Sequence, residues 1–177
     1  MRSSAKIASA QALYDAALGA LSRRAHSVFE MRLYLERRAT EPEAAKSVLA
    51  RLREQRLLDD ARYAREFARM RARTRGQGRF RIARELRARG VSDHNIDAAL
   101  AEAFAQMDEA AMVRKAIERK IRALHRPLDA RKAASVYRSL LRGGFDAGVI
   151  RRELGPTLRR AAAGEELPAV ETQDESD

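Results

Sequence analysis

The stretch IARELRARG, residues 82–90, decides the fold. Ile82 is followed four positions later by Leu86 and four later still by Gly90, which is the spacing of one helix face that ends in a glycine. The pattern occurs twice more, in MRLYLERRA at residues 31–39 and in VYRSLLRGG at residues 136–144. The sequence therefore predicts one helix repeated three times, with glycine in the left-handed conformation at the end of the second and third copies.

A second helix follows each copy, and its start is marked by residue types typical of helix N-termini. These starts are Thr40–Pro42, Ser92–Asp93 and Phe145–Asp146. The inward residues predicted for these helices are Ala45 and Leu49, Ile96 and Leu100, and Ile150 and Leu154.

Another helix precedes each copy, with large apolar residues spaced i, i+4, i+7 on one face. We expect these residues in the core: Tyr14, Leu18 and Leu21; Tyr63, Phe67 and Met70; Ile117, Ile121 and Leu124. Two local signals agree, because Ser27–Glu30 has the pattern of a capping box and Asp59–Asp60 can cap the next helix.

The predicted fold class is all-α, with three tandem three-helix repeats forming an elongated, curved array. Each repeat is too small to bury a sufficient core alone, so we expect neighbours to pack together. The predicted domains are repeat 1 at residues 9–55, the arginine-rich repeat 2 at residues 58–105, repeat 3 at residues 108–163 and a disordered acidic tail at residues 164–177.

The charge distribution predicts an anionic partner. The formal net charge is +11 in 177 residues, yet residues 165–177 hold six acids and no Lys or Arg, which leaves +17 on residues 1–164. A GC-rich coding sequence offers another explanation for so many arginines, and composition alone does not separate the two. The chain has no cysteine, which excludes disulfides and thiolate nucleophiles. With no stretch apolar enough for a signal peptide or a membrane span, we expect a soluble cytoplasmic protein.

The second repeat concentrates the positive charge. Residues 62–89 contain eleven arginines but only two acids, Glu66 and Glu85. A solvated helix face usually pairs acids with bases at i, i+4, and here acids are too few, so a binding surface is the favoured interpretation. At about 100° per residue, four of these arginines form a stripe roughly 80° wide. The stripe consists of Arg62, Arg65, Arg69 and Arg73.

The segment Thr74–Phe80, TRGQGRF, raises the question of a phosphate-binding loop. It lacks the Walker A spacing and follows a helix, so a tight turn between helices is the better interpretation. Phe80 among arginines could stack on a base. Because Phe29 holds the equivalent repeat position, packing at the start of the helix is favoured instead.

No constellation supports catalysis, a cofactor or a metal site. His26, His94 and His125 are scattered without metal-ligand partners, and Ser92–His94 fits a helix cap.

Three segments resemble the successive signatures of the RecX family, the regulatory proteins that bind bacterial RecA recombinase. They are ALSRRAHSVFEMRLYLERR at residues 20–38, LREQRLLDDARYAREFARMRARTRGQGRFRIARELRARGV at residues 52–91 and LLRGGFDAGVIRREL at residues 140–154. The resemblance covers roughly residues 12–155 and has two departures: Phe80 stands where the family commonly has proline, and the acidic tail is not expected of the family.

The resemblance implies a non-enzymatic protein that binds RecA and its nucleoprotein filament and inhibits recombinase, ATPase and coprotease activities. We also expect a monomer. Direct binding to single- or double-stranded DNA is a further possibility. The rival interpretations are a sequence-nonspecific DNA-binding helical module acting without RecA, and a purely structural helical adaptor. The predicted partner- or DNA-binding residues are Arg62, Arg65, Arg69, Arg71, Arg73, Arg75, Arg79, Arg84, Arg87, Arg114, Lys115, Arg119 and Lys120.

Overall fold

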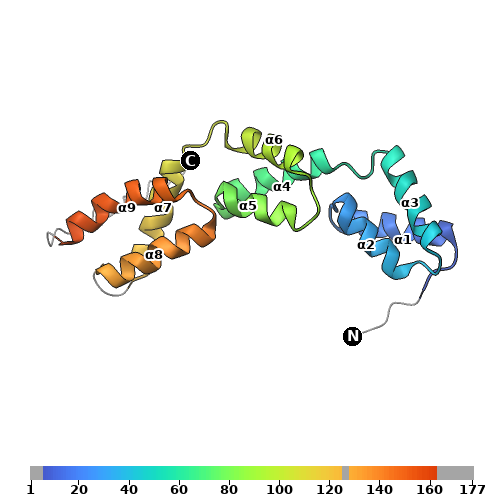
Figure 1. Ribbon diagram of the computed structural model, residues 1–177, viewed down its shortest axis with the longest axis horizontal. Helices are drawn as coiled ribbons and strands as arrows, with labels where there is room; N and C mark the ends of the chain where they lie inside the picture. Colours follow the sequence, from blue (N-terminus) through green and yellow to red (C-terminus); the bar gives the residue numbers. More distant parts are fainter. Residues whose placement is uncertain (1–5, 125–127, 163–177) are drawn as a thin grey trace, which may run out of the picture. The chain divides into compact units, whose positions relative to one another are not determined.

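The computed structural model describes residues 6–124 and 128–162, and the predicted tail at 164–177 lies outside them. Within the described residues the chain forms nine α-helices and no strand beyond a single bridge between Ile7 and Ala39 (Figure 1). The helices are α1 (Ala10–Arg23), α2 (Val28–Arg38), α3 (Pro42–Glu54), α4 (Asp60–Arg75), α5 (Arg79–Arg87), α6 (Asp93–Phe104), α7 (Glu109–Arg122), α8 (Ala130–Gly143) and α9 (Ala147–Ala162). The predicted all-α class is confirmed.

The chain packs into two compact units, and the boundary between them divides α5. The first unit holds the described residues up to Arg75 together with Ile82–Gln106. The second holds Gly76–Arg81 together with the described residues from Met107 onward. The three domain boundaries and their array therefore stay predictions.

The middle helix of each group buries the residues that the repeat pattern indicated. Leu35, Leu86 and Leu140 are almost fully buried in α2, α5 and α8. Four positions before them, Met31, Ile82 and Val136 are also buried. In the following helices, Ala45, Ile96, Ile150 and Leu154 are buried as predicted, whereas Leu49 and Leu100 are only half-buried.

The predicted inward face of the first helix of each group is partly wrong. Tyr14, Phe67 and Ile117 are buried, but Leu18 and Met70 are 36% and 44% exposed. Alanines and other residues occupy much of the buried face: Leu13, Ala17 and Ala20 in α1; Ala64, Ala68 and Ala72 in α4; Val113 and Ala116 in α7. A small side chain lets a neighbouring helix approach closely, and this turns the larger residues of the same helix outward.

Gly90 ends α5 in the left-handed conformation that its position predicted. Its φ is 72°, and the Val91 N–H donates to the Leu86 carbonyl oxygen at 3.2 Å. A Cβ at this position would lie 2.4 Å from the Phe29 Cβ. Glycine is therefore required both for the backbone angle and for the approach of Phe29.

The segment Gly76–Arg81 does more than turn between two helices. The Gly78 N–H donates to the Gly143 carbonyl oxygen at 2.9 Å, and the Phe80 N–H donates to the Gly144 carbonyl oxygen at 3.1 Å. A Cβ on Gly78 would lie 2.2 Å from the Gly144 oxygen. Backbone hydrogen bonds therefore join the segment Gly76–Arg81 to the end of α8 within the second unit.

The expected packing of Phe80 at the helix start is wrong, because its side chain is 58% exposed. Phe29, at the equivalent position of the first repeat, packs over Gly90, which has no side chain. Phe80 is attached through its backbone, and its ring lies outward.

Two predicted caps differ in their outcome. The Ser27–Glu30 capping box is present in both directions. The Asp59 carboxylate caps α4 by accepting from the Arg62 N–H at 3.0 Å. The Asp60 carboxylate instead accepts from the Val28 N–H at 2.9 Å, so it ties the start of α4 to the start of α2.

We predict that Gly90→Ala destabilises the protein by about 2 kcal/mol or more, since a left-handed non-glycine residue alone costs about 1–2 kcal/mol and the methyl group also meets Phe29. Urea unfolding followed by circular dichroism measures the change. Gly76→Ala is the matched control, because Gly76 has a φ of 55° but open space around its Cβ direction. Equal losses in both variants would contradict a role for the contact with Phe29.

Candidate functional site

The predicted arginine stripe lies on the outer surface of α4. Arg62, Arg65, Arg69 and Arg73 are all exposed, whereas Ala64, Ala68 and Ala72 of the same helix are buried. Binary patterning along the helix therefore produces a core face of alanine and a surface of guanidinium groups.

Two of the four stripe residues have an acid beside them. Arg65 Nε lies 4.0 Å from Glu102 Oε2, and Arg69 forms an ion pair with Glu66. Among the described residues no ion pair is found for Arg62 or Arg73. The hydrogen bond from Arg69 lowers the pKa of the Glu66 carboxyl, and the charges of Arg69, Arg65 and Arg62 lower it further. The arginines around Glu66 thus favour the charged form of its carboxyl.

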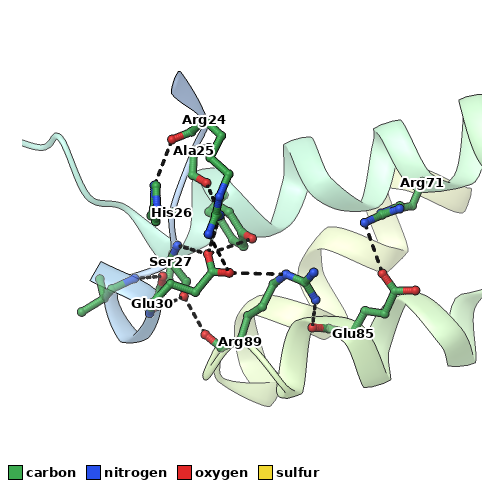
Figure 2. Close-up of polar contacts among 11 residues, drawn as sticks. Arg24, Ala25, His26, Ser27, Glu30, Arg71, Glu85 and Arg89 are labelled. Carbon is green, nitrogen blue, oxygen red and sulfur yellow. Dashed lines mark hydrogen bonds and ion pairs between the residues drawn. The ribbon is translucent and has the colours of Figure 1, made fainter. Parts of the chain in front are cut away.

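Arg71 lies to a different side of α4 and is largely buried. Its guanidinium is 3.5 Å from the Glu85 carboxylate, its side chain is 14% exposed, and its guanidinium carbon lies 4.8 Å from the centre of the Phe67 ring. Figure 2 shows Arg71 and Glu85 pointing toward one another from two helices. Arg71 therefore stabilises the packing of α4 against α5 within the first unit.

The remaining predicted arginines around α5 are divided between the units. Arg75 and Arg84 are exposed in the first unit, as is Arg87, whose Nε lies 2.6 Å from the Asp93 carboxylate. Arg79 belongs to the second unit and lies 3.5 Å from Glu109.

The four predicted residues on α7 lie in the second unit. Arg114 bridges Asp108 at 3.3 Å and Glu153 at 3.1 Å. Lys115 and Arg119 are exposed and Lys120 is half-buried, and the described residues offer none of these three an ion pair.

A convergence of charges on Glu30 was not predicted. Its carboxylate lies 3.0 Å from Arg24 Nη1 and 3.8 Å from Arg89 Nε, and it accepts from the Ser27 N–H at 3.2 Å and from the Tyr63 hydroxyl at 3.4 Å. Arg24 and Arg89 approach it from two different segments (Figure 2). The capping box placed Glu30 locally, but sequence spacing carried no signal for Arg89 or Tyr63.

The same region holds Arg89 by further bonds. Its Nη1 donates to the Glu85 carbonyl oxygen at 2.6 Å, and the Ser27 hydroxyl donates to the Arg89 carbonyl oxygen at 2.6 Å. The start of α2 is therefore fixed to the end of the α5 segment by both charge and backbone.

The carboxyl groups of Glu30 and Asp60 are shifted in opposite directions. Burial raises the pKa of Glu30, but hydrogen bonds from Arg24 and Ser27 and the charges of Arg24 and Arg89 outweigh it, so the net shift is downward. Burial raises the pKa of Asp60, and the charge of Asp59 adds to that rise. Of these two carboxyl groups, only Glu30 has cations and hydrogen bonds that outweigh burial and favour its charged form.

The described part of the chain contains no group of three or more metal-ligating side chains placed to hold an ion. No helix in residues 6–124 or 128–162 is long and apolar enough to cross a membrane.

The fold and this surface define a class: an all-α protein that carries an exposed arginine stripe on α4. Sequence comparisons identify the family. Residues 14–52 match the profile of "RecX, first three-helix domain" and residues 59–100 match "RecX, second three-helix domain". The chain belongs to the RecX family of regulatory proteins.

Relatives and solved structures agree with this assignment. The chain is 42% identical over 144 residues to "Regulatory protein RecX" of Halorhodospira halophila, which covers 81% of this chain and 87% of the relative. It is 38% identical over 138 residues to "Regulatory protein RecX" of Pseudomonas fluorescens, a match that covers 78% of this chain and 86% of the relative. The "Crystal structure of RecX from Lactobacillus salivarius" matches with a TM-score of 0.67 and 20% identity over 85% of this chain and 96% of that one, which shows a shared fold.

We predict that Glu30→Gln lowers the free energy of unfolding by about 1–2 kcal/mol at pH 7, because charge-assisted hydrogen bonds are lost. Since the folded pKa of Glu30 is depressed, its contribution is present above about pH 4.3 and is lost as the pH falls through the folded pKa. Urea unfolding of both proteins from pH 7 to pH 3 measures the difference.

The control is Glu36→Gln, whose exposed carboxylate lies 3.4 Å from Arg32 and should matter little at either pH. A difference between wild type and Glu30→Gln that stays constant across this range would show that the carboxylate charge is not what stabilises the site.

Proposed function

We propose that this protein binds RecA recombinase and its nucleoprotein filament, and that it inhibits the recombinase, ATPase and coprotease activities of the filament. Family membership supports this proposal, together with the role that the resemblance implies. The observation that carries it is the exposed stripe on α4, in which Arg62 and Arg73 have no acidic partner among the described residues.

The stripe suits an acidic or phosphate-bearing surface for physical reasons. A guanidinium offers paired N–H donors that match a carboxylate or a phosphate, and it keeps its charge at every physiological pH. The stripe is the candidate surface of the first unit, and Lys115, Arg119 and Lys120 of α7 are the candidate contacts of the second. In this proposal they contact acidic residues of RecA or the backbone of its bound DNA.

The rival is a DNA-binding module that acts without RecA, and the same arginines favour it. Its signature is tight binding to naked DNA near physiological salt, with log affinity falling by about 0.9 per duplex phosphate neutralised for each unit of log salt concentration. A structural adaptor would bind neither RecA nor DNA.

We predict that the protein inhibits RecA-catalysed ATP hydrolysis on single-stranded DNA when present at well below the RecA concentration. Inhibition should persist when single-stranded DNA is in excess, because the protein acts on the filament rather than competing for DNA. ATP turnover in a coupled assay measures this. Inhibition that excess DNA abolishes would favour the rival, and no inhibition would reject the family role here.

The double variant Arg62→Glu/Arg73→Glu should bind the filament at least about tenfold more weakly, or about 1.4 kcal/mol. Neither residue has an ion pair in the described structure, so the fold should persist. Arg37→Glu/Arg53→Glu is the control, because it changes the net charge equally at two exposed residues of α2 and α3. Equal losses in the two variants would indicate that only net charge matters.

A further inference from the structure

The first unit exposes a cluster of large apolar side chains. Leu18 and Leu57 are 36% and 38% exposed, and Met70 is 44% exposed. All three line two adjoining clefts that share Ala25, Tyr63 and Glu66. One cleft continues to Leu18, Leu21 and Leu57, and the other to Phe67, Met70, Arg71 and Arg89. We call the two together the α4 furrow.

The wall of the furrow is the second apolar face of α4. Tyr63, Phe67 and Met70 follow one another at i, i+4 and i+7. Phe67 belongs to the core together with the buried alanines, whereas Tyr63 is half-buried and Met70 is 44% exposed. At about 1.5 Å per residue, the stretch from Tyr63 to Met70 runs roughly 10 Å along α4, the length of about two turns of a helix. An apolar strip of this length matches the seam that an amphipathic helix buries.

The furrow does not suit stacked bases. The Phe67 ring is stacked with the Tyr63 ring at 6.0 Å between centroids. The guanidinium carbons of Arg71 and Arg89 each lie 4.8 Å from the Phe67 centroid. Since Phe67 is almost wholly buried by these neighbours, it offers no free face for a nucleobase.

The charges of the furrow favour a partner with acidic residues. Glu30 is already paired with Arg24 and Arg89, and Glu66 is paired with Arg69. Arg62 lines the furrow, and no ion pair is found for it in the described part of the chain. Asp59 lines the same cleft, and its carboxylate caps α4 by accepting from the Arg62 N–H. The open site therefore combines apolar side chains with a guanidinium that has no ion-pair partner in the described residues.

We propose that the α4 furrow docks an amphipathic helical segment of a protein partner, in which an apolar face is flanked by acidic residues. The apolar face covers Leu18, Leu57 and Met70, and a carboxylate pairs with Arg62. RecA as the source of this segment rests on the proposed function, whereas docking of such a segment in the furrow does not.

Because the chain has no cysteine, a single introduced thiol can report on the furrow. Met70→Cys carrying an environment-sensitive fluorophore is titrated with a short synthetic helical peptide that has a leucine stripe and glutamate elsewhere. The same peptide with lysine in place of glutamate tests the charge. Leu141→Cys, at an exposed apolar residue of α8 in the second unit, is the control label site.

The expected result is a saturable blue shift at Met70 with the glutamate peptide and none at Leu141. The lysine peptide should bind the labelled protein at least tenfold more weakly than the glutamate peptide. Unlabelled Leu18→Asp/Leu57→Asp protein should compete for the glutamate peptide at least tenfold more weakly than unlabelled wild type. Its circular dichroism should match wild type because both leucines are exposed. No saturable shift, equal shifts with both peptides, or a shift with oligothymidylate alone would overturn the proposal.

A second titration uses RecA filaments on single-stranded DNA. A shift at Met70 alone supports RecA as the source of the segment. If the labelled protein still inhibits RecA ATPase but shows no shift at Met70, docking of RecA in the furrow is overturned and the proposed function stays intact. If wild-type protein does not inhibit RecA at all, the proposed function fails, and the peptide titration decides the furrow independently.

Discussion

The close packing of α4 through its alanines is the constraint on which the first unit depends. Ala64, Ala68 and Ala72 are buried, and a face of such small side chains lets the neighbouring helix approach closely. The bulk of α4 must then be placed elsewhere on its circumference. Aromatic and methionine side chains fall on one flank and arginines on another, so one packing choice creates both candidate binding surfaces.

Local signals in the sequence predicted most of the fold. The helices of all three groups, the left-handed glycines at 90 and 144 and the Ser27–Glu30 capping box depend on residues close together in the chain. The orientation of α1 and α4 could not be predicted in the same way. Large apolar residues and alanines gave two competing faces, and only contacts with distant helices decide between them.

The sequence predicted which residues make up the candidate site, but not which of its arginines are held by packing and which are exposed for binding. Sequence located the stripe, whose exposure follows from helical periodicity. It placed Arg71 outside the stripe, but it carried no signal that Arg71 is held by Glu85 and by the Phe67 ring while Arg62 has no ion pair in the described residues. Nor could it bring Arg89 to Glu30, because that contact joins segments far apart in the chain. Arginines of one sequence region thus serve two purposes, packing and recognition.

The main-chain contact of Gly78 with Gly143 and Gly144 has a consequence for how this chain can vary. A side chain added at Gly78 would meet backbone atoms of Gly144, and one added at Gly144 would meet the backbone of Arg81. A clash with a side chain can be relieved by trimming that side chain, but a clash with backbone leaves nothing to trim. Second-site suppressors should therefore be rare here, and the two glycines constrain one another as a pair although they are far apart in the sequence.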